Sequence, residues 1–214
     1  MNNMFYILTG LLGFLLSGMW YATNILLLNI FANKGWKAAT PFSALLTSLL
    51  PLAAISLYRG YLPLNLHMLF NYQLWAIIFV TLIITCLVVR LKKNCHYNEY
   101  GLLGLCVETA SIEIAQRLMM QTFVILLLEH WKCHTIWCVL INALIWCLDI
   151  LVQPVLLRQP IKKEILIELI ASFIFSMGIG YVFYFSECFL LGVLAHMAER
   201  MISNMGKKVK AESV

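Results

Sequence analysis

The chain has 214 residues, of which 62% are hydrophobic and only 12% charged, and its mean hydropathy is +0.87. This composition excludes a soluble globular domain and predicts an all-α protein, a polytopic membrane helix bundle. The net charge of +5 does not indicate nucleic-acid binding, because the Lys and Arg residues lie between long apolar runs, where they set topology. We therefore expect a multi-pass protein of the cell membrane whose surroundings are the lipid bilayer.

Seven apolar runs are candidate membrane spans, because about 20 apolar residues are needed to cross a bilayer. They lie at 5–31, 41–58, 72–89, 100–128, 135–157, 165–185 and 189–203. The first run follows no basic leader and is too long for a signal-peptide core, so we expect it to stay as a scaffold helix. The second run is short and contains Pro51, which predicts a broken helix or one beside a re-entrant segment at 61–70. The expected organisation is one membrane domain, 1–204, followed by a basic tail, 205–214.

The basic residues between these runs predict an orientation. Eleven Lys or Arg residues follow odd-numbered spans, whereas only Arg59 and Lys132 follow even-numbered ones. Because cytoplasmic loops carry the excess of positive charge, the N-terminus is expected outside and the C-terminus in the cytoplasm.

Glu113 and Arg117 lie in the middle of the fourth run. Residues four apart on a helix share a face, and here the shared face also carries Thr109 and Gln116. A charge near the bilayer centre costs roughly 2.5 to 3.5 kcal/mol on insertion scales, so such residues face a bundle interior and pair there. The pair is either a structural lock of the bundle or part of a functional site.

Other polar residues are expected in the cytoplasmic half of the last four spans. The fourth span adds Glu108, the fifth carries Asn142, Trp146, Asp149 and Gln153, the sixth begins with Glu164 and Glu168, and the seventh carries Gly192, His196, Glu199 and Arg200. We predict a cavity open to the cytoplasm in which Glu113, Arg117, Asp149 and His196 converge, with Arg117 or Arg200 as the partner of Asp149. The alternative for His196, Glu199 and Arg200 is an interfacial polar cluster at a helix end.

Cysteine and metal chemistry are not expected. The seven cysteines are odd in number and mostly lie inside apolar runs, where Cys behaves as a small hydrophobe, so no disulfide framework is predicted. Cys95-His96 and Cys133-His134 are lone pairs in loops predicted on opposite membrane faces, which excludes a joint metal site. The sequence identifies no cofactor.

Two segments resemble the CPBP family, the CAAX-protease and bacteriocin-processing membrane proteins. The family signature is Glu-Glu-x-x-x-Arg, then an aromatic-x-x-x-His, then a closing His-x-x-x-Asn/Asp. The run IEIAQR at 112–117 supplies the second Glu, Glu113, and the Arg, Arg117, whereas Ile112 stands where the first Glu is expected. The stretch GIGYVFYFSECFLLGVLAHMAERM at 178–201 is similar to the family's last two helices, with His196 in the histidine position and Arg200 replacing Asn or Asp. The resemblance covers 100–204, and Ile145 or the nearby Asp149 occupies the region of the middle histidine.

The resemblance implies an intramembrane peptidase site in which glutamates activate a water and histidines stabilise the oxyanion. Glu113 and His196 are the catalytic candidates, but Glu113 is expected to be neutralised by Arg117, and Glu108, five residues away, is turned off the shared face. We therefore expect a degenerate relative that binds a membrane-associated peptide or a membrane protein, of the bacteriocin self-immunity or regulatory type. The alternative is an active CAAX-type endopeptidase. A transporter is a third reading, which the lack of paired broken helices and of an internal repeat weakens.

Overall fold

The computed structural model describes residues 2–91, 101–156 and 163–211. This part of the chain is all-helical, as the composition predicts, and contains one isolated antiparallel bridge, Leu64 to Cys188, in place of any strand. The elements are α1 (Asn2–Asn33), α2 (Ala39–Arg59), η1 (Leu66–Phe70), α3 (Tyr72–Val89), α4 (Gly101–Glu113), η2 (Ile114–Gln121), α5 (Thr122–His130), α6 (Trp137–Leu156), α7 (Lys163–Ser186) and α8 (Phe189–Ala211).

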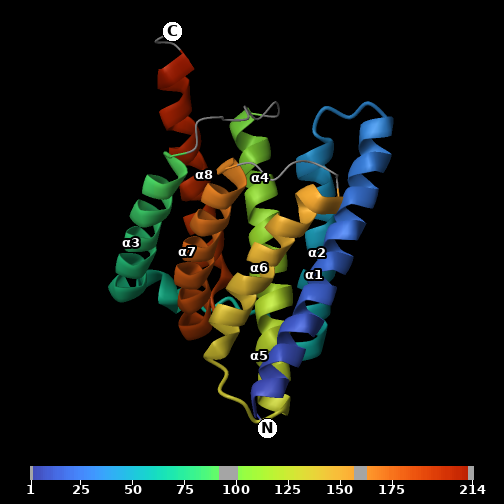
Figure 1. Ribbon diagram of the computed structural model, residues 1–214, viewed down its shortest axis with the longest axis vertical. Helices are drawn as coiled ribbons and strands as arrows, with labels where there is room; N and C mark the ends of the chain where they lie inside the picture. The colour runs from blue at the N-terminus through green and yellow to red at the C-terminus, as the bar shows by residue number, and fades with distance from the viewer. Residues whose placement is uncertain (1, 92–100, 157–162, 212–214) are drawn as a thin grey trace.

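Within the described ranges, five helices are long and apolar enough to cross a membrane: Asn3–Asn33, Ala39–Arg59, Tyr72–Val89, Gly101–His130 and Lys163–Ser186. Helix α6 has a shorter apolar part, Trp137–Val152, and α8 gains charged residues from Glu199 onward. Seven spans therefore stay a prediction. Figure 1 shows the helices running alternately from one end of the bundle to the other, with the two termini at opposite ends.

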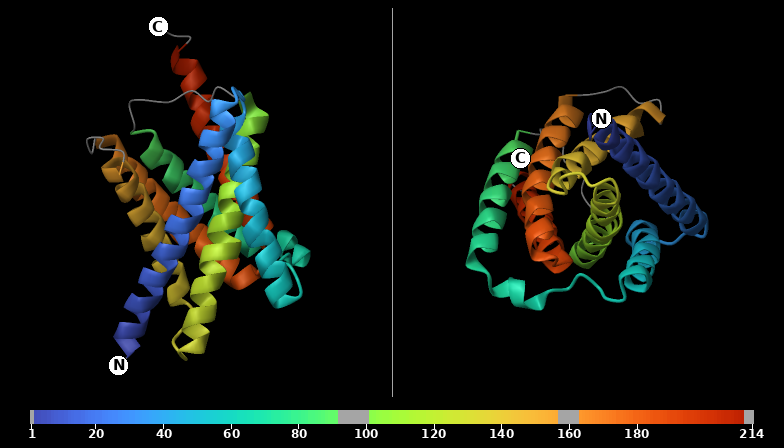
Figure 2. Two further views of the ribbon diagram at one scale, coloured as in Figure 1. Left: turned by 90° about the vertical axis from the view of Figure 1, so that its right-hand side faces the viewer. Right: turned by 90° about the horizontal axis from the view of Figure 1, so that it is seen from below.

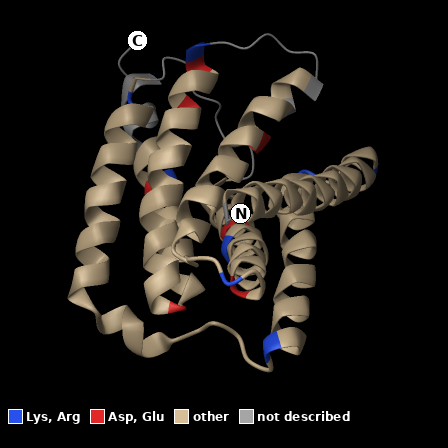
Figure 3. Cartoon of the chain, turned by 60° about the horizontal axis from the view of Figure 1, so that its bottom comes forward, with Lys and Arg blue, Asp and Glu red and all other residues tan. Residues whose placement is uncertain are grey.

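The outer surface of the bundle suits lipid. Large apolar side chains such as Leu57, Phe79 and Leu103 are among the most exposed. Figure 3 shows the sides of the helices almost free of charged residues, which gather instead near helix ends and in the interior. This distribution is the one expected of a bundle whose surroundings are apolar, because a charge facing hydrocarbon is costly.

Helix α2 differs from its sequence-based expectation. Pro51 lies inside the helix, which runs unbroken to Arg59 and ends at Gly60 in a left-handed conformation (φ 71°). Residues 66–70 of the segment expected to be re-entrant form the short 3₁₀ helix η1, outside α2. Pro51 thus does not interrupt the helix, although a proline cannot donate the backbone hydrogen bond that the carbonyl of Thr47 would otherwise accept.

Elements α4, η2 and α5 form one continuous rod that carries the polar residues of the fourth span. Figure 2 shows this rod surrounded by the other helices. Its middle, Ile114–Gln121, is π-helical, and the backbone N–H and the hydroxyl of Thr122 both bond to the carbonyl of Arg117, five residues earlier. Such π-helical turns are rare and are often found at functional sites.

The turn between α7 and α8 is fixed by the loop that precedes η1. The backbone N–H of Phe189 donates to the carbonyl of Pro63 (3.3 Å), and the N–H of Cys188 donates to the hydroxyl of Ser186 (3.1 Å). Glu187 takes a left-handed conformation at this turn (φ 49°), which is unusual for a residue with a side chain. The turn directs α8 back along the rod and so sets the position of His196 two turns later.

Candidate functional site

The centre of the site is a buried chain of polar side chains on the rod. Arg117 Nε donates to Glu113 Oε2 (3.0 Å), and Arg117 Nη1 donates to Gln121 Oε1 (3.2 Å). All three side chains are fully buried. The four-residue spacing predicted the first contact, and the same spacing accounts for the second. Gln121 was missed from the sequence, although its position one turn after Arg117 is a usable signal.

His196 of α8 joins this chain at Glu113. Its Nδ1 lies 3.1 Å from Glu113 Oε1, while Arg200 Nε donates to its Nε2 (3.4 Å). Because a guanidinium is always a donor, the Nε2 of His196 must accept, and the neutral ring then carries its hydrogen on Nδ1 and donates to the carboxylate. Both oxygens of Glu113 are therefore occupied, one by Arg117 and one by His196.

A glycine allows α8 to come this close to the rod. A Cβ atom on Gly192, one turn before His196, would lie 2.9 Å from Glu113 Oε2 and 3.2 Å from Ile179 Cγ2. The site therefore needs a residue without a side chain at this position. The sequence placed Gly192 on the same stripe as His196, and the structure gives the reason for it.

Helix α7 closes the other side of the polar chain. Gln121 Nε2 donates to the backbone carbonyl of Gly180 (2.7 Å) and lies 3.8 Å from Cys138 Sγ on α6. A Cβ on Gly180 would lie 3.3 Å from Arg117 Nη1, so the guanidinium is held directly against the α7 backbone. The rod is thus connected to both α6 and α7 through polar groups that hydropathy alone does not indicate.

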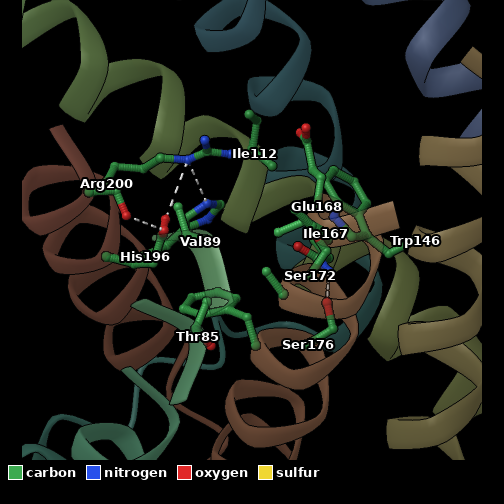
Figure 4. A pocket seen from close by; sticks show the side chains of 15 residues that line it. Thr85, Val89, Ile112, Trp146, Ile167, Glu168, Ser172, Ser176, His196 and Arg200 are labelled. Carbon is green, nitrogen blue, oxygen red and sulfur yellow. Dashed lines mark hydrogen bonds and ion pairs between the residues drawn. The ribbon is translucent and has the colours of Figure 1, made fainter. Parts of the chain in front are cut away.

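A cavity of about 100 Å³ adjoins this centre on the side of the bundle where α8 continues towards the C-terminus. It is lined from α3, the rod, α6, α7 and α8, and Figure 4 shows His196 and Arg200 on one side of it and Trp146 and Glu168 on the other. Gln116 Nε2 donates to Ser176 Oγ (2.9 Å) at its inner end. The predicted cavity was one in which Glu113, Arg117, Asp149 and His196 converge, and of these four only His196 lines the cavity described here.

The cavity wall carries an apolar side chain next to the buried carboxylate. Ile112 lines the cavity, whereas Glu113 does not. The carboxylates in the wall come from α7 and α8: Glu168, and Glu199, which accepts a hydrogen bond from Ser203 (2.7 Å) and lies 3.5 Å from Arg200 Nε. His196, Glu199 and Arg200, for which an interfacial polar cluster was the alternative, all line this cavity.

Asp149 does not join the site, contrary to the prediction. Its carboxylate accepts a hydrogen bond from Ser17 of α1, and it does not line the cavity. The expected partners, Arg117 and Arg200, are engaged with Glu113, His196 and Glu199. The prediction was wrong about the partner because Ser17 lies in a helix whose neighbours the sequence does not specify. The pattern of small and polar residues in α1 could have suggested it.

The candidate residues still to be placed are Asn142, Glu108 and Gln153. Asn142 is fully buried on α6, and neither its Oδ1 nor its Nδ2 has a hydrogen-bond partner in the described part of the chain. Glu108 is half-buried on α4, one turn above the central pair and with its own interaction. The side chain of Gln153 lies outside what the structure describes.

The arrangement is suited to holding a buried charge pair next to a small polar cavity. Glu113 is compensated twice, by Arg117 and by His196, and it does not line the cavity. Among the described residues no group of three or more His, Cys, Asp and Glu side chains could hold a metal ion. Comparisons with protein-family models, with curated proteins and with solved structures gave no match, so the residues of the chain itself carry the functional argument.

Proposed function

We propose that this chain is a CPBP-like protein of the cell membrane that binds a membrane-associated peptide or a membrane protein partner without cleaving it. In this proposal it spans the membrane seven times with its N-terminus outside, and it belongs to the bacteriocin self-immunity or regulatory type. The binding site is the cavity between α7 and α8, which would open towards the cytoplasm.

One observation carries the proposal: the wall of the cavity has Ile112 where a peptidase of this family needs its first glutamate, while Glu113 is buried behind it. A general base must reach the water that it activates within hydrogen-bond distance. Glu113 does not line the cavity, and its two oxygens bond to Arg117 and His196 (3.0 and 3.1 Å), so in this proposal it anchors α8 and does not act as a base.

The cavity offers what a bound peptide group needs. Arg200 and His196 supply nitrogen groups, Ser172 and Ser176 supply hydroxyls, and Trp146 and Phe175 supply apolar surface. A volume of about 100 Å³ corresponds to roughly three water molecules at about 30 Å³ each, or to one small side chain. The site therefore fits a single side chain or chain end of a peptide that lies against the bundle.

An active endopeptidase is the second candidate, and the contact between Glu113 and His196 favours it. A carboxylate 3.1 Å from an imidazole is a common element of hydrolytic sites, and Glu168 and Glu199 reach the cavity wall. In this alternative Glu113 would have to exchange Arg117 for a water during turnover.

A cavity-filling variant separates binding from chemistry. Ser172→Leu places an apolar side chain in the cavity, and Ile170→Phe adds similar bulk on the exposed face of the same helix as the matched control. Cells expressing each full-length variant would be challenged with a panel of membrane-active bacteriocins, and a photoreactive residue at Trp146 would be tested for crosslinking to the same tagged peptides.

We expect survival and crosslinking in wild type and Ile170→Phe and loss of both in Ser172→Leu, with intact peptide recovered in every case. If the peptide is recovered as fragments from surviving cells, and if Glu113→Gln at equal protein level loses both survival and fragments, the endopeptidase is established and the binding proposal is overturned. If Ser172→Leu protects cells as well as the wild type does, the cavity is not the binding site.

A further inference from the structure

A second cavity lies at the opposite end of the bundle from the first. Its volume is about 280 Å³, and its wall includes Thr122 and Ile125 from the rod, Thr135 just before α6, and Phe183 and Tyr184 from α7. The hydroxyls of Thr135 and Tyr184 are hydrogen-bonded to each other (2.7 Å). The rod and α7 therefore contribute to both cavities, and the segment that leads into α6 lines the second.

The layer between the cavities is thin. On α7, Ser176 lines the first cavity and Phe183 the second. Seven residues of α-helix rise about 10 Å, which is about two helical turns. On the rod, Gln116 lines the first cavity and Thr122 the second, so the separation there is similar.

Polar groups lie in this thin layer among apolar core residues such as Leu118 and Ile179. Gln121 on the rod meets Cys138 on α6. The rod and α6 run in opposite directions. Arg117 lies four residues before Gln121 on the rod, and Asn142 lies four residues after Cys138 on α6, so both are one helical turn nearer the first cavity. One further turn along α6 reaches Trp146, which lines the first cavity. By their positions along the rod and α6, Gln121, Arg117 and Asn142 thus lie between the residues that line the two cavities.

Three groups of this layer have no hydrogen-bond partner in the described residues: Nη2 of Arg117 and both Oδ1 and Nδ2 of Asn142. Both side chains are fully buried. Leaving a buried polar group unsatisfied costs about 1 to 3 kcal/mol, so each of these groups would gain from a partner that the described residues do not supply. Two of these groups donate hydrogen bonds and one accepts them. A small molecule that can both donate and accept hydrogen bonds would therefore find partners here.

We propose that the two cavities are the mouths of one polar path, and that small uncharged molecules, water first, pass through the layer between them. The Arg117 guanidinium in the path is balanced by Glu113 at 3.0 Å, so the layer has no net charge that would attract an ion of either sign. An ion would also have to give up its water to enter this buried layer, which is costly.

Two hydrogen bonds close the path and can open by side-chain rotation alone. Gln116 bonds to Ser176 (2.9 Å) at the first cavity, and Gln121 bonds to the carbonyl of Gly180 (2.7 Å) towards the second. Rotation of an amide side chain requires no movement of a helix. The proposal does not rest on peptide binding, because Ser172 and Arg200 are not part of the layer.

The test uses the purified full-length chain reconstituted into liposomes, with water as the probe. Liposome shrinkage after an osmotic step is followed by light scattering, and proton entry is followed with an enclosed pH-sensitive dye. We expect faster shrinkage than in protein-free liposomes, with no increase in proton entry. Shrinkage at the rate of protein-free liposomes would overturn the proposal, and proton entry through the wild type would overturn the restriction to uncharged molecules.

Two variants locate the path. Asn142→Leu replaces the unpartnered amide by an apolar group of similar size, and Gly180→Ala adds a methyl 3.3 Å from Arg117 Nη1 and 3.4 Å from Gln121 Oε1. Both should lose the extra water permeability. Leu144→Ala, two positions from Asn142 and on the exposed side of α6, is the matched control and should keep it. If Asn142→Leu and Gly180→Ala elute as folded proteins and are as permeable to water as the wild type, water does not take this route.

Discussion

Replacing Glu113 by Gln should destabilise the bundle more than almost any other single change. The substitution keeps the shape of the side chain but removes the negative charge that faces Arg117 Nε at 3.0 Å and His196 Nδ1 at 3.1 Å. Arg117 then remains fully buried without a counter-charge. Removing one partner of a buried ion pair costs about 3 to 5 kcal/mol.

The loss can be measured as a fall in the thermal unfolding midpoint of the purified protein in detergent. For a chain of this size, 1 kcal/mol corresponds to about 2 to 4 °C, so Glu113→Gln should unfold roughly 6 to 20 °C below wild type. Arg117→Met alone should also be destabilising, because it leaves the carboxylate buried with only His196 as partner.

The double variant Glu113→Gln with Arg117→Met is the control that tests the reasoning. Because it removes both charges together, it should recover most of the loss seen in either single variant. A single Glu113→Gln variant that unfolds within about 2 °C of wild type would show that the pair is not desolvated as we describe. A double variant no better than the singles would show that the loss comes from shape and not from charge.

Three further predictions follow from other parts of the fold. Gly192→Ala should lower the free energy of unfolding by about 1 to 3 kcal/mol, because its methyl would press on the buried carboxylate of Glu113. Gly18→Ala, whose methyl meets nothing within 4 Å, should not destabilise the protein, and thermal unfolding compares the two variants directly. Glu187→Gly should raise the unfolding midpoint, since a left-handed residue with a side chain carries about 1 kcal/mol of strain or more, and an unchanged or lower midpoint would contradict this. Reporter fusions should place the loop at Lys34 in the cytoplasm and the loop at Lys132 outside; the reverse result would refute the predicted orientation.

Much of the helix pattern could be predicted from hydropathy, because each apolar run has to satisfy its own backbone and therefore forms a helix. The run at 72–89 coincides with α3, Tyr72–Val89. Pro51 does not break α2, whereas a broken helix was one of the two expectations, because a membrane helix can tolerate a proline. Residues 205–211 of the predicted basic tail continue α8.

How well a contact of the candidate site could be predicted depends on whether it lies within one helix or between two helices. The pairing of Glu113 with Arg117 could be predicted because it depends only on helical spacing. The contact of Glu113 with His196 was anticipated from the cost of burying each alone. The partner of Asp149 could not be predicted, since it depends on which helix packs beside α6, and sequence spacing says nothing about that neighbour.

The central claim is that Glu113 anchors α8 and performs no peptidase chemistry, and its most direct test is a turnover measurement. Purified wild-type protein would be incubated in lipid with a tagged membrane peptide, and the products would be identified by mass spectrometry alongside the Glu113→Gln with Arg117→Met double variant. Our account predicts intact peptide in both samples. Defined cleavage products with wild type that are absent with the folded double variant would contradict it.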